Sequence, residues 1–414
     1  MINALLTAQR SLAERPVDEI LAVLDRVTAR WLDHADPIRL EAEAGLAEST
    51  GLAPLMIRRG LDDMIRRVQG IGDLLDLDLG SREALDGFFW RAGGVYSRAW
   101  GPGLLTCVFS GNVPGIPAFD MALGLALKSA VLVRPASEEP VFAPLFARSV
   151  AAEDEALGRC LAVTRWGYEE TWPYERAGAV LAYGSDQSVA AIRRLVPAGV
   201  RFLGHGHKIS FAVVTREACT KETAQQLAYD VTMYDQQGCV SPHMAFVERG
   251  GALAPSAFAA AVGSALREYA ASMPRRKLTA TEALALRGAR DEAEFTADAL
   301  YASPGDLAWT VVHSETPAFL PSPLNRLLRT FAVDDADAVA PLVAPYAPYL
   351  QTVAFAGPTE RLLEVAEELG RLGVSRVCPV GRVQQPGPLW RHDGRPTAGD
   401  LVRWTDIEAR EDAP

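Results

Sequence analysis

The chain has 414 residues, a formal net charge of −11 and a hydrophobic content of 49%, so it can form two or three domains with a large buried core. Its acidic balance argues against a general nucleic-acid or anionic-membrane surface, because both require an excess of lysine and arginine. Its five cysteines are scattered and include no Cys-x-x-Cys pair, which argues against a disulfide framework and a structural zinc site.

Neither a transmembrane span nor a secretory leader is predicted. The stretch that comes closest to a span, residues 122–133, is interrupted by Lys128 and is shorter than the ~18 residues that such a helix needs. Residues 1–16 contain no long apolar core and no small-residue cleavage pattern. We therefore expect a cytoplasmic protein.

In chain order, residues 1–100 are predicted to be mainly helical, since Val17, Ile20 and Leu24 recur at helical spacing and Pro16 is typical of a helix start. Strands are then predicted at 104–109, 130–133, 160–166, 177–183 and 209–214, alternating with helices at 116–128, 141–152, 185–195 and 221–234. This alternation predicts an α/β fold with a doubly wound, largely parallel sheet, in which ligands bind at the carboxyl ends of the strands.

A second compact unit is expected to start after Gly250. Its helices are predicted at 252–272, 277–300, 336–342 and 360–372, and its strands at 310–313 and 328–333. The segment 384–388 is predicted to be a loop, and the tail that follows it is polar.

Several common motifs are absent. No Gly-x-Gly-x-x-Gly follows a strand, and neither a P-loop nor a Gly-x-Ser-x-Gly elbow occurs, which weakens the usual dinucleotide, nucleotide and serine-hydrolase interpretations. His205 and His207 form an i, i+2 pair without a third ligand at metal spacing, so no metal site is predicted.

The strongest chemical signal is the segment 234–242, Tyr-Asp-Gln-Gln-Gly-Cys-Val-Ser-Pro. Gly238 permits a tight turn, and a new helix is expected to begin just after Cys239. A thiol at a helix N-terminus has a lowered pKa, and the same backbone N–H groups can hold an oxyanion. Acyl transfer needs both features, so Cys239 is predicted to be a catalytic nucleophile. The alternative is a buried, inert cysteine.

Residues 235–242, together with several upstream motifs, resemble the acyl-CoA reductases first known from bacterial luminescence, a family within the aldehyde dehydrogenase superfamily. Ser110-Gly111-Asn112-Val113-Pro114 is similar to the superfamily segment Pro-Trp-Asn-Phe-Pro. The resemblance implies that Asn112 is an oxyanion-hole asparagine, and it places Ser110 and Gly111 in the cofactor site. An amide N–H at the end of a strand can stabilise a tetrahedral oxyanion, whereas the alternative is that Asn112 only shapes a turn.

The resemblance also implies a nucleotide site. Residues 130–137 are similar to the stretch that holds the adenosine ribose, with Arg134 in place of a lysine and Ser137 where NAD-preferring members often carry a glutamate. Ser137 removes a repulsive carboxylate and Arg134 can meet a 2′-phosphate, which favours NADPH. The alternative is that Arg134 is a solvated strand end. Gly184 and Ser185 resemble the superfamily's Phe-Thr-Gly-Ser and are expected to bind the pyrophosphate.

Residues 203–208 resemble the superfamily's Leu-Glu-Leu-Gly-Gly-Lys, but Gly204 stands where oxidising members carry the glutamate that activates water. The resemblance therefore implies reduction. His205, His207 and His243 are candidate acid/base groups, and His243 would share a helix face with Cys239. The superfamily motif that grips the nicotinamide ribose is missing, and Pro-Leu-Asn-Arg stands near its place at 323–326.

Taken together, the resemblance implies an aldehyde dehydrogenase-like fold. A helical region and NADP-binding domain are expected at 1–220, a catalytic domain at 221–380 and a C-terminal return segment at 381–414. The expected reaction is NADPH-dependent reduction of an acyl-CoA or acyl-carrier thioester to an aldehyde through a thioester on Cys239. The alternatives are an NADP-dependent aldehyde or semialdehyde dehydrogenase and a non-catalytic acyl-binding subunit. A homo-oligomer or an acyl-transferring partner protein stays open.

Overall fold

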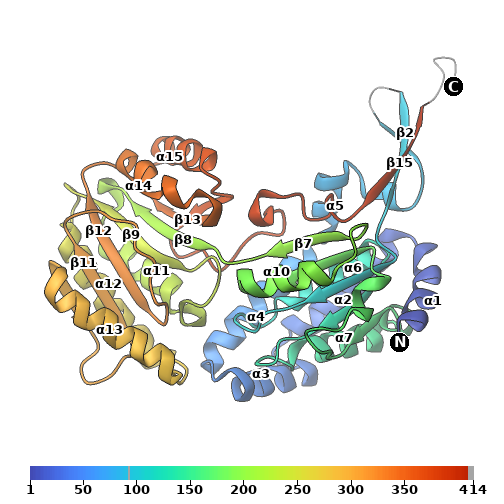
Figure 1. Ribbon diagram of the computed structural model, residues 1–414, viewed down its shortest axis with the longest axis horizontal. Coiled ribbons are helices and arrows are strands. Elements are labelled where there is room, and N and C mark those ends of the chain that lie inside the picture. Colours follow the sequence, from blue (N-terminus) through green and yellow to red (C-terminus); the bar gives the residue numbers. More distant parts are fainter. Residues whose placement is uncertain (92–93, 409–414) are drawn as a thin grey trace. The chain divides into compact units, whose positions relative to one another are not determined.

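The computed structural model describes residues 1–91 and 94–408, and its contacts divide the chain into two compact units (Figure 1). The first unit comprises Met1–Thr50, Arg59–Gly206 and Gly387–Pro414, and the second comprises Gly51–Arg58 and His207–Pro386. By contacts, the mid-chain boundary falls between Gly206 and His207, upstream of the predicted domain limit at residue 220. The assignment of functions to the three predicted domains stays a prediction.

A five-stranded sheet forms the centre of the first unit. Its order is β5 (Leu161–Val163), β4 (Ala130–Arg134), β3 (Leu104–Val108), β6 (Ala179–Tyr183) and β7 (Arg201–His205), and every neighbouring pair is parallel. The predicted doubly wound parallel sheet is confirmed, with β7 as an additional strand. The strand predicted at 209–214 belongs instead to the sheet of the second unit, which begins before Gly250. The chain runs from β3 outwards to β5 and then returns to β6 on the opposite side of β3. Doubly wound sheets bind ligands beside such a reversal, at the carboxyl ends of the strands.

Helices cover both faces of this sheet, because its strands bury side chains on both sides. Leu104, Leu132 and Val180 pack on one face with Leu5 of α1 (Ile2–Ala13). On the other face a Cβ added to Gly124 of α6 would lie only 2.5 Å from Val131 Cγ2. The helices that follow α1 in chain order are α2 (Val17–Leu32), α3 (Pro37–Thr50), α4 (Pro54–Gln69), α5 (Ile71–Leu79), α6 (Pro117–Ala126), α7 (Phe142–Glu153), α8 (Glu155–Gly158), α9 (Trp172–Glu175) and α10 (Asp186–Leu195). The predicted helical character of the start of the chain is thus confirmed as far as Leu79.

A small antiparallel sheet belongs to the same unit. It consists of β1 (Phe89–Arg91), β2 (Val95–Trp100) and β15 (Arg403–Glu408), and Figure 1 shows β2 and β15 side by side. None of these three strands was expected, since the first hundred residues were predicted to be mainly helical and the tail was predicted to be polar. Pairing between segments that are so distant in the sequence leaves no local signal.

The second unit contains a seven-stranded sheet. Its order is β10 (Ala299–Ala302), β11 (Thr310–Ser314), β12 (Leu327–Val333), β9 (Pro242–Glu248), β8 (Ile209–Val214), β13 (Leu350–Ala356) and β14 (Arg376–Pro379). All pairs are parallel except β10 with β11. Alternate residues of β8 face opposite sides. Ala212 and Val214 pack with α11 (Lys221–Thr232) and α12 (Pro255–Ser272), whereas Phe211 and Val213 pack with α14 (Val339–Val343) and α15 (Thr359–Arg371).

One predicted helix of this unit ends earlier than expected. The helix predicted at 277–300 is α13 (Ala280–Thr296), which begins at a capping box formed by Thr279 and Glu282. Its predicted last residues instead form β10, because Asp298 donates its N–H to His313 O and the chain joins the sheet antiparallel to β11. Across the residues that are described, no helix is both long and apolar enough to cross a membrane.

Candidate functional site

Cys239 lies in the second unit, in the short loop before β9. The predicted helix start after this residue is wrong, because the next element is the strand Pro242–Glu248. A helix dipole therefore cannot act on this thiol. Of the five cysteines, all of them described, Cys239 alone is not buried. Exposure to substrate is thus confined to the cysteine that the sequence singles out.

The other four thiols are poor nucleophiles in this fold. Burial raises the pKa of Cys107 well above its usual value, and burial raises the pKa of Cys160, Cys219 and Cys378 to about 11 in each case. The thiolate is the reactive form of cysteine. At neutral pH these four residues therefore remain protonated and are shielded by their surroundings.

The Cys239 loop is fixed by hydrogen bonds on both sides. Ser210 Oγ on β8 donates to Cys239 O at 2.9 Å, and Ser241 N–H donates to Gly238 O at 2.9 Å. Gln384 Nε2 donates to Ser241 Oγ at 2.7 Å. A Cβ on Gly238 would stand 3.0 Å from Gln384 Oε1, so the Gln384 side chain passes close to the backbone of the loop.

Two left-handed turns lie next to the loop. Tyr234, Asp235 and Gln236 have φ values of 53°, 51° and 66°, and they end α11 at Thr232, two residues before the predicted end. A second left-handed run follows at 324–326, where φ is 64°, 56° and 64°. Left-handed conformations of residues other than glycine are costly and persist only where surrounding contacts impose them.

A buried ion pair joins these two turns. Arg326 Nε donates to Asp235 Oδ1 at 2.8 Å, and both side chains are completely buried. Gln237 Nε2 donates to Asn325 Oδ1 at 3.1 Å, and Gln236 Nε2 donates to Leu327 O at 2.9 Å. The segment 323–326, which the sequence offered only as the place of a missing cofactor motif, thus supports the backbone that leads to Cys239.

His207 and His243, the two candidate acid/base histidines of this unit, differ in their surroundings. His243 lies on β9 and is buried, so the expected shared helix face with Cys239 is wrong. Burial lowers the pKa of His243 to about 4, and the charge of His207 acts in the same direction. Its Nδ1 accepts a hydrogen bond from Ser322 N–H at 3.3 Å. His243 is therefore neutral at physiological pH, whereas His207 is exposed.

In the first unit, Asn112 follows β3 and is exposed. Ser110 Oγ donates a hydrogen bond to Asn112 Oδ1 at 2.7 Å. This hydrogen bond engages the amide oxygen of Asn112, so any donation by its side chain comes from the N–H₂ group. Gly111 sits against the next loop, since a Cβ there would lie 3.0 Å from Ala136 Cβ.

The structure brings together Arg134 and Ser137, which the sequence assigned to the adenosine ribose, around a third residue. The Arg134 guanidinium lies 4.4 Å from the centre of the exposed Tyr168 ring. A hydrogen bond from Arg134 and its charge lower the pKa of the Tyr168 hydroxyl, and a hydrogen bond from Ser137 adds to this, whereas Glu138 opposes it. A cation, a hydroxyl and an exposed ring together suit a phosphorylated ribose. Tyr168 carried no signal in the sequence.

Gly184 and Ser185 connect the end of β6 to α10. Ser185 caps this helix by accepting a hydrogen bond from Ser188 N–H at 3.2 Å. The first N–H groups of such a helix form an anion site. Gly111, Arg134 and Gly184 therefore stand at the carboxyl ends of three neighbouring strands, β3, β4 and β6, as a dinucleotide site in this sheet requires.

Gly204 has no room for a side chain. A Cβ at this position would lie 2.5 Å from Val189 Cγ1 and 2.9 Å from Phe202 Cε1. Such distances are far below ordinary carbon–carbon contacts of about 3.5–4.0 Å. A glutamate could therefore not occupy position 204 without a rearrangement of β7 and α10.

A stack of rings lines the ends of β3, β6 and β7. Ring centres are 5.5 Å apart for Phe109 and Tyr183, 4.7 Å for Tyr183 and His205, 4.2 Å for His205 and His392, and 4.6 Å for His392 and Trp390. Two of these rings, Trp390 and His392, come from the C-terminal segment. They are too far from the strands in the sequence for any local pattern to predict this contact.

His205, His392 and Asp393 together have the composition of a metal site. His205 Nδ1 lies 2.7 Å from Asp393 Oδ2, but the two imidazole planes are stacked at an angle of 11°. Since the lone pairs of imidazole lie in the ring plane, stacked rings do not direct them at one ion. The absence of a metal from the site stays a prediction.

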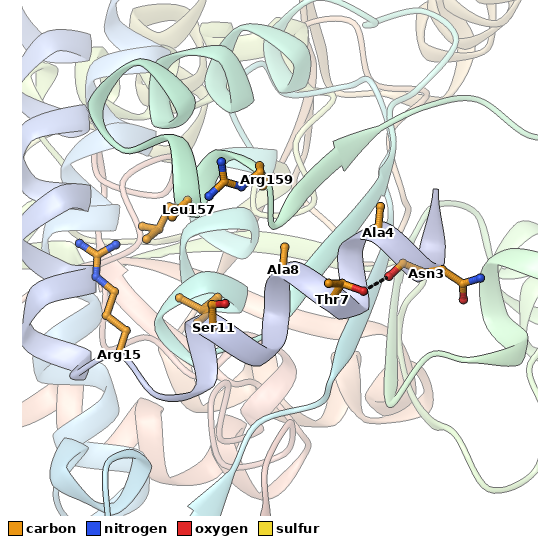
Figure 2. A pocket seen from close by; sticks show the side chains of 10 residues that line it. Asn3, Ala4, Thr7, Ala8, Ser11, Arg15, Leu157 and Arg159 are labelled. Carbon is orange, nitrogen blue, oxygen red and sulfur yellow. Dashed lines mark hydrogen bonds between the residues drawn. The ribbon is translucent and has the colours of Figure 1, made fainter.

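A groove of about 570 Å³ occurs beside α1 and α8. Figure 2 shows Ala4, Thr7, Ala8 and Ser11 along α1, Arg15 beyond one end of that helix, and Arg159 with Leu157 on the facing segment. Arg15 and Arg159 are paired with Asp154 and Glu155 at 2.7 and 2.8 Å. The lining includes no residue of the predicted site, and its cations are neutralised.

A family model described as acyl-CoA reductase (LuxC) matches residues 12–404. A long-chain acyl-protein thioester reductase of Aliivibrio fischeri is 26% identical over 344 residues, which is 81% of this chain and 70% of that protein. A long-chain acyl-protein thioester reductase 2 of Photobacterium leiognathi is 23% identical over 402 residues, with coverages of 95% and 82%.

Solved structures match the fold at lower identity. A methylmalonate-semialdehyde dehydrogenase of Oceanimonas doudoroffii has a TM-score of 0.78 at 15% identity, over 98% of this chain and 88% of that chain. An NADP-dependent glyceraldehyde-3-phosphate dehydrogenase of Bacillus halodurans, solved with NADP, has a TM-score of 0.76 at 15% identity, with coverages of 98% and 89%. The expected aldehyde dehydrogenase-like fold is confirmed, and the chain belongs to the acyl-CoA reductase (LuxC) family.

Proposed function

We propose that this protein reduces an acyl thioester to an aldehyde with NADPH, through a covalent thioester on Cys239. The observation that carries the proposal is the position of Cys239: it is the one cysteine that is not buried, in a loop fixed by Ser210 and Gln384. Family membership supplies the reaction class. Relatives named as acyl-protein thioester reductases support a thioester as the acyl donor.

The first half of the reaction is acyl transfer to Cys239. Its thiolate attacks the carbonyl carbon of the substrate thioester, a carbon–sulfur bond forms, and the carbonyl oxygen becomes an oxyanion. Collapse of that adduct breaks the bond to the original thiol, which leaves and takes up a proton. The resemblance to aldehyde dehydrogenases implies that Asn112 is the oxyanion donor, and Ser110 Oγ donates to its amide oxygen at 2.7 Å.

The second half releases the aldehyde. NADPH, when bound, would supply a hydride to the acyl carbon. The bond between that carbon and Cys239 Sγ then breaks, which releases the aldehyde and returns the Cys239 thiolate. The chain's part is to hold the acyl group on Cys239 and to exclude competing hydrolysis. Gly204 supports this direction, because the tight contacts with Val189 and Phe202 leave no place for a water-activating glutamate.

The direct test mixes the purified protein with NADPH and two kinds of acyl donor, a chain-length series of acyl-CoA and the same acyl groups on an acyl-carrier protein. We expect aldehyde to form in step with NADPH oxidation, at a rate that depends on the acyl chain. Oxidation of free aldehyde with NADP⁺ and no thiol acceptor, without any thioester reduction, would instead identify an oxidative dehydrogenase. Absence of cofactor binding together with acyl binding would identify a non-catalytic subunit.

Cofactor preference is expected to depend on Arg134. Replacement of Arg134 by alanine removes the cation beside Tyr168, so kcat/KM with NADPH should fall about 10–100-fold while that with NADH changes little. Ser137→Glu should likewise lower kcat/KM with NADPH and leave that with NADH little changed, because a carboxylate repels the 2′-phosphate. Steady-state kinetics with both cofactors measure the effect. Arg148→Ala, an exposed arginine on α7 paired with Glu41, serves as the matched control, and equal losses with NADPH and NADH would contradict the assignment.

A further inference from the structure

We propose that Arg376 is a positioning residue that holds the Cys239 sulfur in its reactive, anionic form. This inference rests on the proposed function of Cys239 and names the group that replaces the helix dipole expected from the sequence. Arg376 opens β14 and is partly buried. No motif pointed to it.

The Arg376 side chain is fixed by main-chain acceptors. Its Nη1 donates to Val383 O at 2.6 Å and its Nη2 donates to Arg382 O at 2.9 Å. Both acceptors are neutral carbonyls, so these bonds hold the guanidinium in place without cancelling its positive charge. A fixed cation in a partly buried setting acts more strongly on its neighbours than a mobile one in water.

The segment that Arg376 binds is the one that contacts the Cys239 loop. Directly after Val383, Gln384 donates from Nε2 to Ser241 Oγ at 2.7 Å and to Asp230 O at 3.3 Å. Its Oε1 stands 3.0 Å from the position of a Cβ on Gly238. The guanidinium, the segment 382–384 and the loop around Cys239 are therefore parts of one connected polar structure.

Charges also connect Arg376 to Cys239 directly. Burial lowers the pKa of the Arg376 guanidinium, whereas Cys378, Asp230 and Cys239 each raise it. An interaction of this kind is mutual: a sulfur anion that stabilises the guanidinium is itself stabilised by it. Burial raises the pKa of Cys378 to about 11, so among the two thiols near Arg376 only the accessible Cys239 is suited to ionise.

Other charged groups near the loop are paired or neutral. Arg276, which donates to Asn325 Oδ1 at 3.4 Å, is paired with Glu282. Asp235 is paired with Arg326. His243 on β9 is neutral, because burial lowers its pKa to about 4. Burial raises the pKa of Asp230 on α11 to about 7, although N–H groups of Gly381 and Val383 and the charge of Arg376 oppose this. Asp230 therefore carries negative charge above neutral pH, and this charge acts on the Arg376 guanidinium.

The test is the pH dependence of Cys239 alkylation by iodoacetamide in the full-length protein, followed by mass spectrometry of the Cys239 peptide. Arg376→Met should move the midpoint of the rate profile upwards by about one pH unit, because an opposite charge nearby has been removed. Arg376→Lys should restore most of the shift. Removal of Arg376 would also raise the pKa of Asp230 and so leave that carboxyl less negative. A less negative neighbour would lower the pKa of Cys239, so an upward shift of the midpoint cannot come from Asp230.

The matched control is Arg329→Met, since Arg329 is a partly buried arginine on β12 of the same unit whose charge interacts with Glu292. Its alkylation profile should coincide with that of the wild type. An unmoved midpoint in Arg376→Met overturns the proposal, and if that variant does not fold, an unmoved midpoint in Arg376→Gln does so. The measurement needs no thioester or NADPH, so failure of the proposed reaction would be recognised separately in the reductase assay.

Discussion

Replacement of Cys239 by serine is expected to lower the rate of acyl thioester reduction by on the order of 10³-fold or more. A serine hydroxyl is far less acidic than a thiol and cannot replace sulfur in a readily reduced acyl-enzyme. The effect should lie in kcat, because Cys239 forms a bond in the reaction rather than a ground-state contact. No other cysteine can substitute for it, since the remaining four are buried.

This expectation is checked by steady-state kinetics and by trapping the acyl-enzyme with a labelled acyl thioester. Wild-type protein incubated without NADPH should retain label on the Cys239 peptide, and Cys239→Ser should retain none that hydroxylamine releases at neutral pH. Cys219→Ser is the matched control: the Cys219 thiol donates to Leu253 O at 3.2 Å, and a hydroxyl can do the same. Wild-type turnover in Cys239→Ser would show that another residue is the nucleophile.

The sequence was most informative where a short motif follows a strand. Ser110, Arg134 and Gly184 each directly follow or end a strand that the apolar pattern predicted, and the order of β3, β4 and β6 in the sheet brings these ends together. The alternation of strands and helices therefore predicted, without tertiary information, that these residues gather at one end of the sheet, and their binding of a cofactor stays a prediction. The parallel sheet itself follows from the same alternation of strands and helices.

Sequence reasoning failed where long-range contacts override local preference. Gly238 before Cys239 suggested a turn into a helix, but Pro242 to Glu248 pair between β8 and β12 and are buried along their whole length. Burial on both faces gives a continuous apolar run, which periodicity alone cannot distinguish from a buried helix. Tyr168 and Arg376 could not be found either, because their roles depend on partners from other segments.

The two left-handed turns beside Cys239 show a further limit of local reasoning. Tyr234 and Gln236, and Leu324 and Arg326 in the second turn, are residues with no preference for positive φ, so each costs of order 1–3 kcal/mol in that conformation. Their stability must come from the contacts between the turns, above all from Asp235 and Arg326. The sequence separates these two residues by 91 positions, and no spacing rule relates them.

Replacement of Arg326 by methionine is therefore expected to destabilise the protein by about 3–5 kcal/mol, because it leaves the Asp235 carboxylate buried without its partner. Both side chains have no exposed surface, so water cannot take over the role of the guanidinium. Met273 O would also lose the hydrogen bond that Arg326 Nη2 donates at 2.9 Å. The melting temperature should fall by on the order of 10 °C, and the denaturant midpoint should fall in parallel.

The charge argument behind this expectation is tested by a double-mutant cycle. Asp235→Asn keeps a residue that tolerates positive φ but removes the charge, and it should also destabilise when introduced alone, since it leaves the buried guanidinium unneutralised. Combined with Arg326→Met it should recover part of the loss, because no unpaired charge remains. Arg371→Met removes an ion pair whose partners Arg371 and Glu367 are 71% and 68% exposed, and it should change stability by less than about 0.5 kcal/mol. Strict additivity of the Asp235 and Arg326 substitutions would show that other contacts hold the two turns and that the ion pair does not stabilise them.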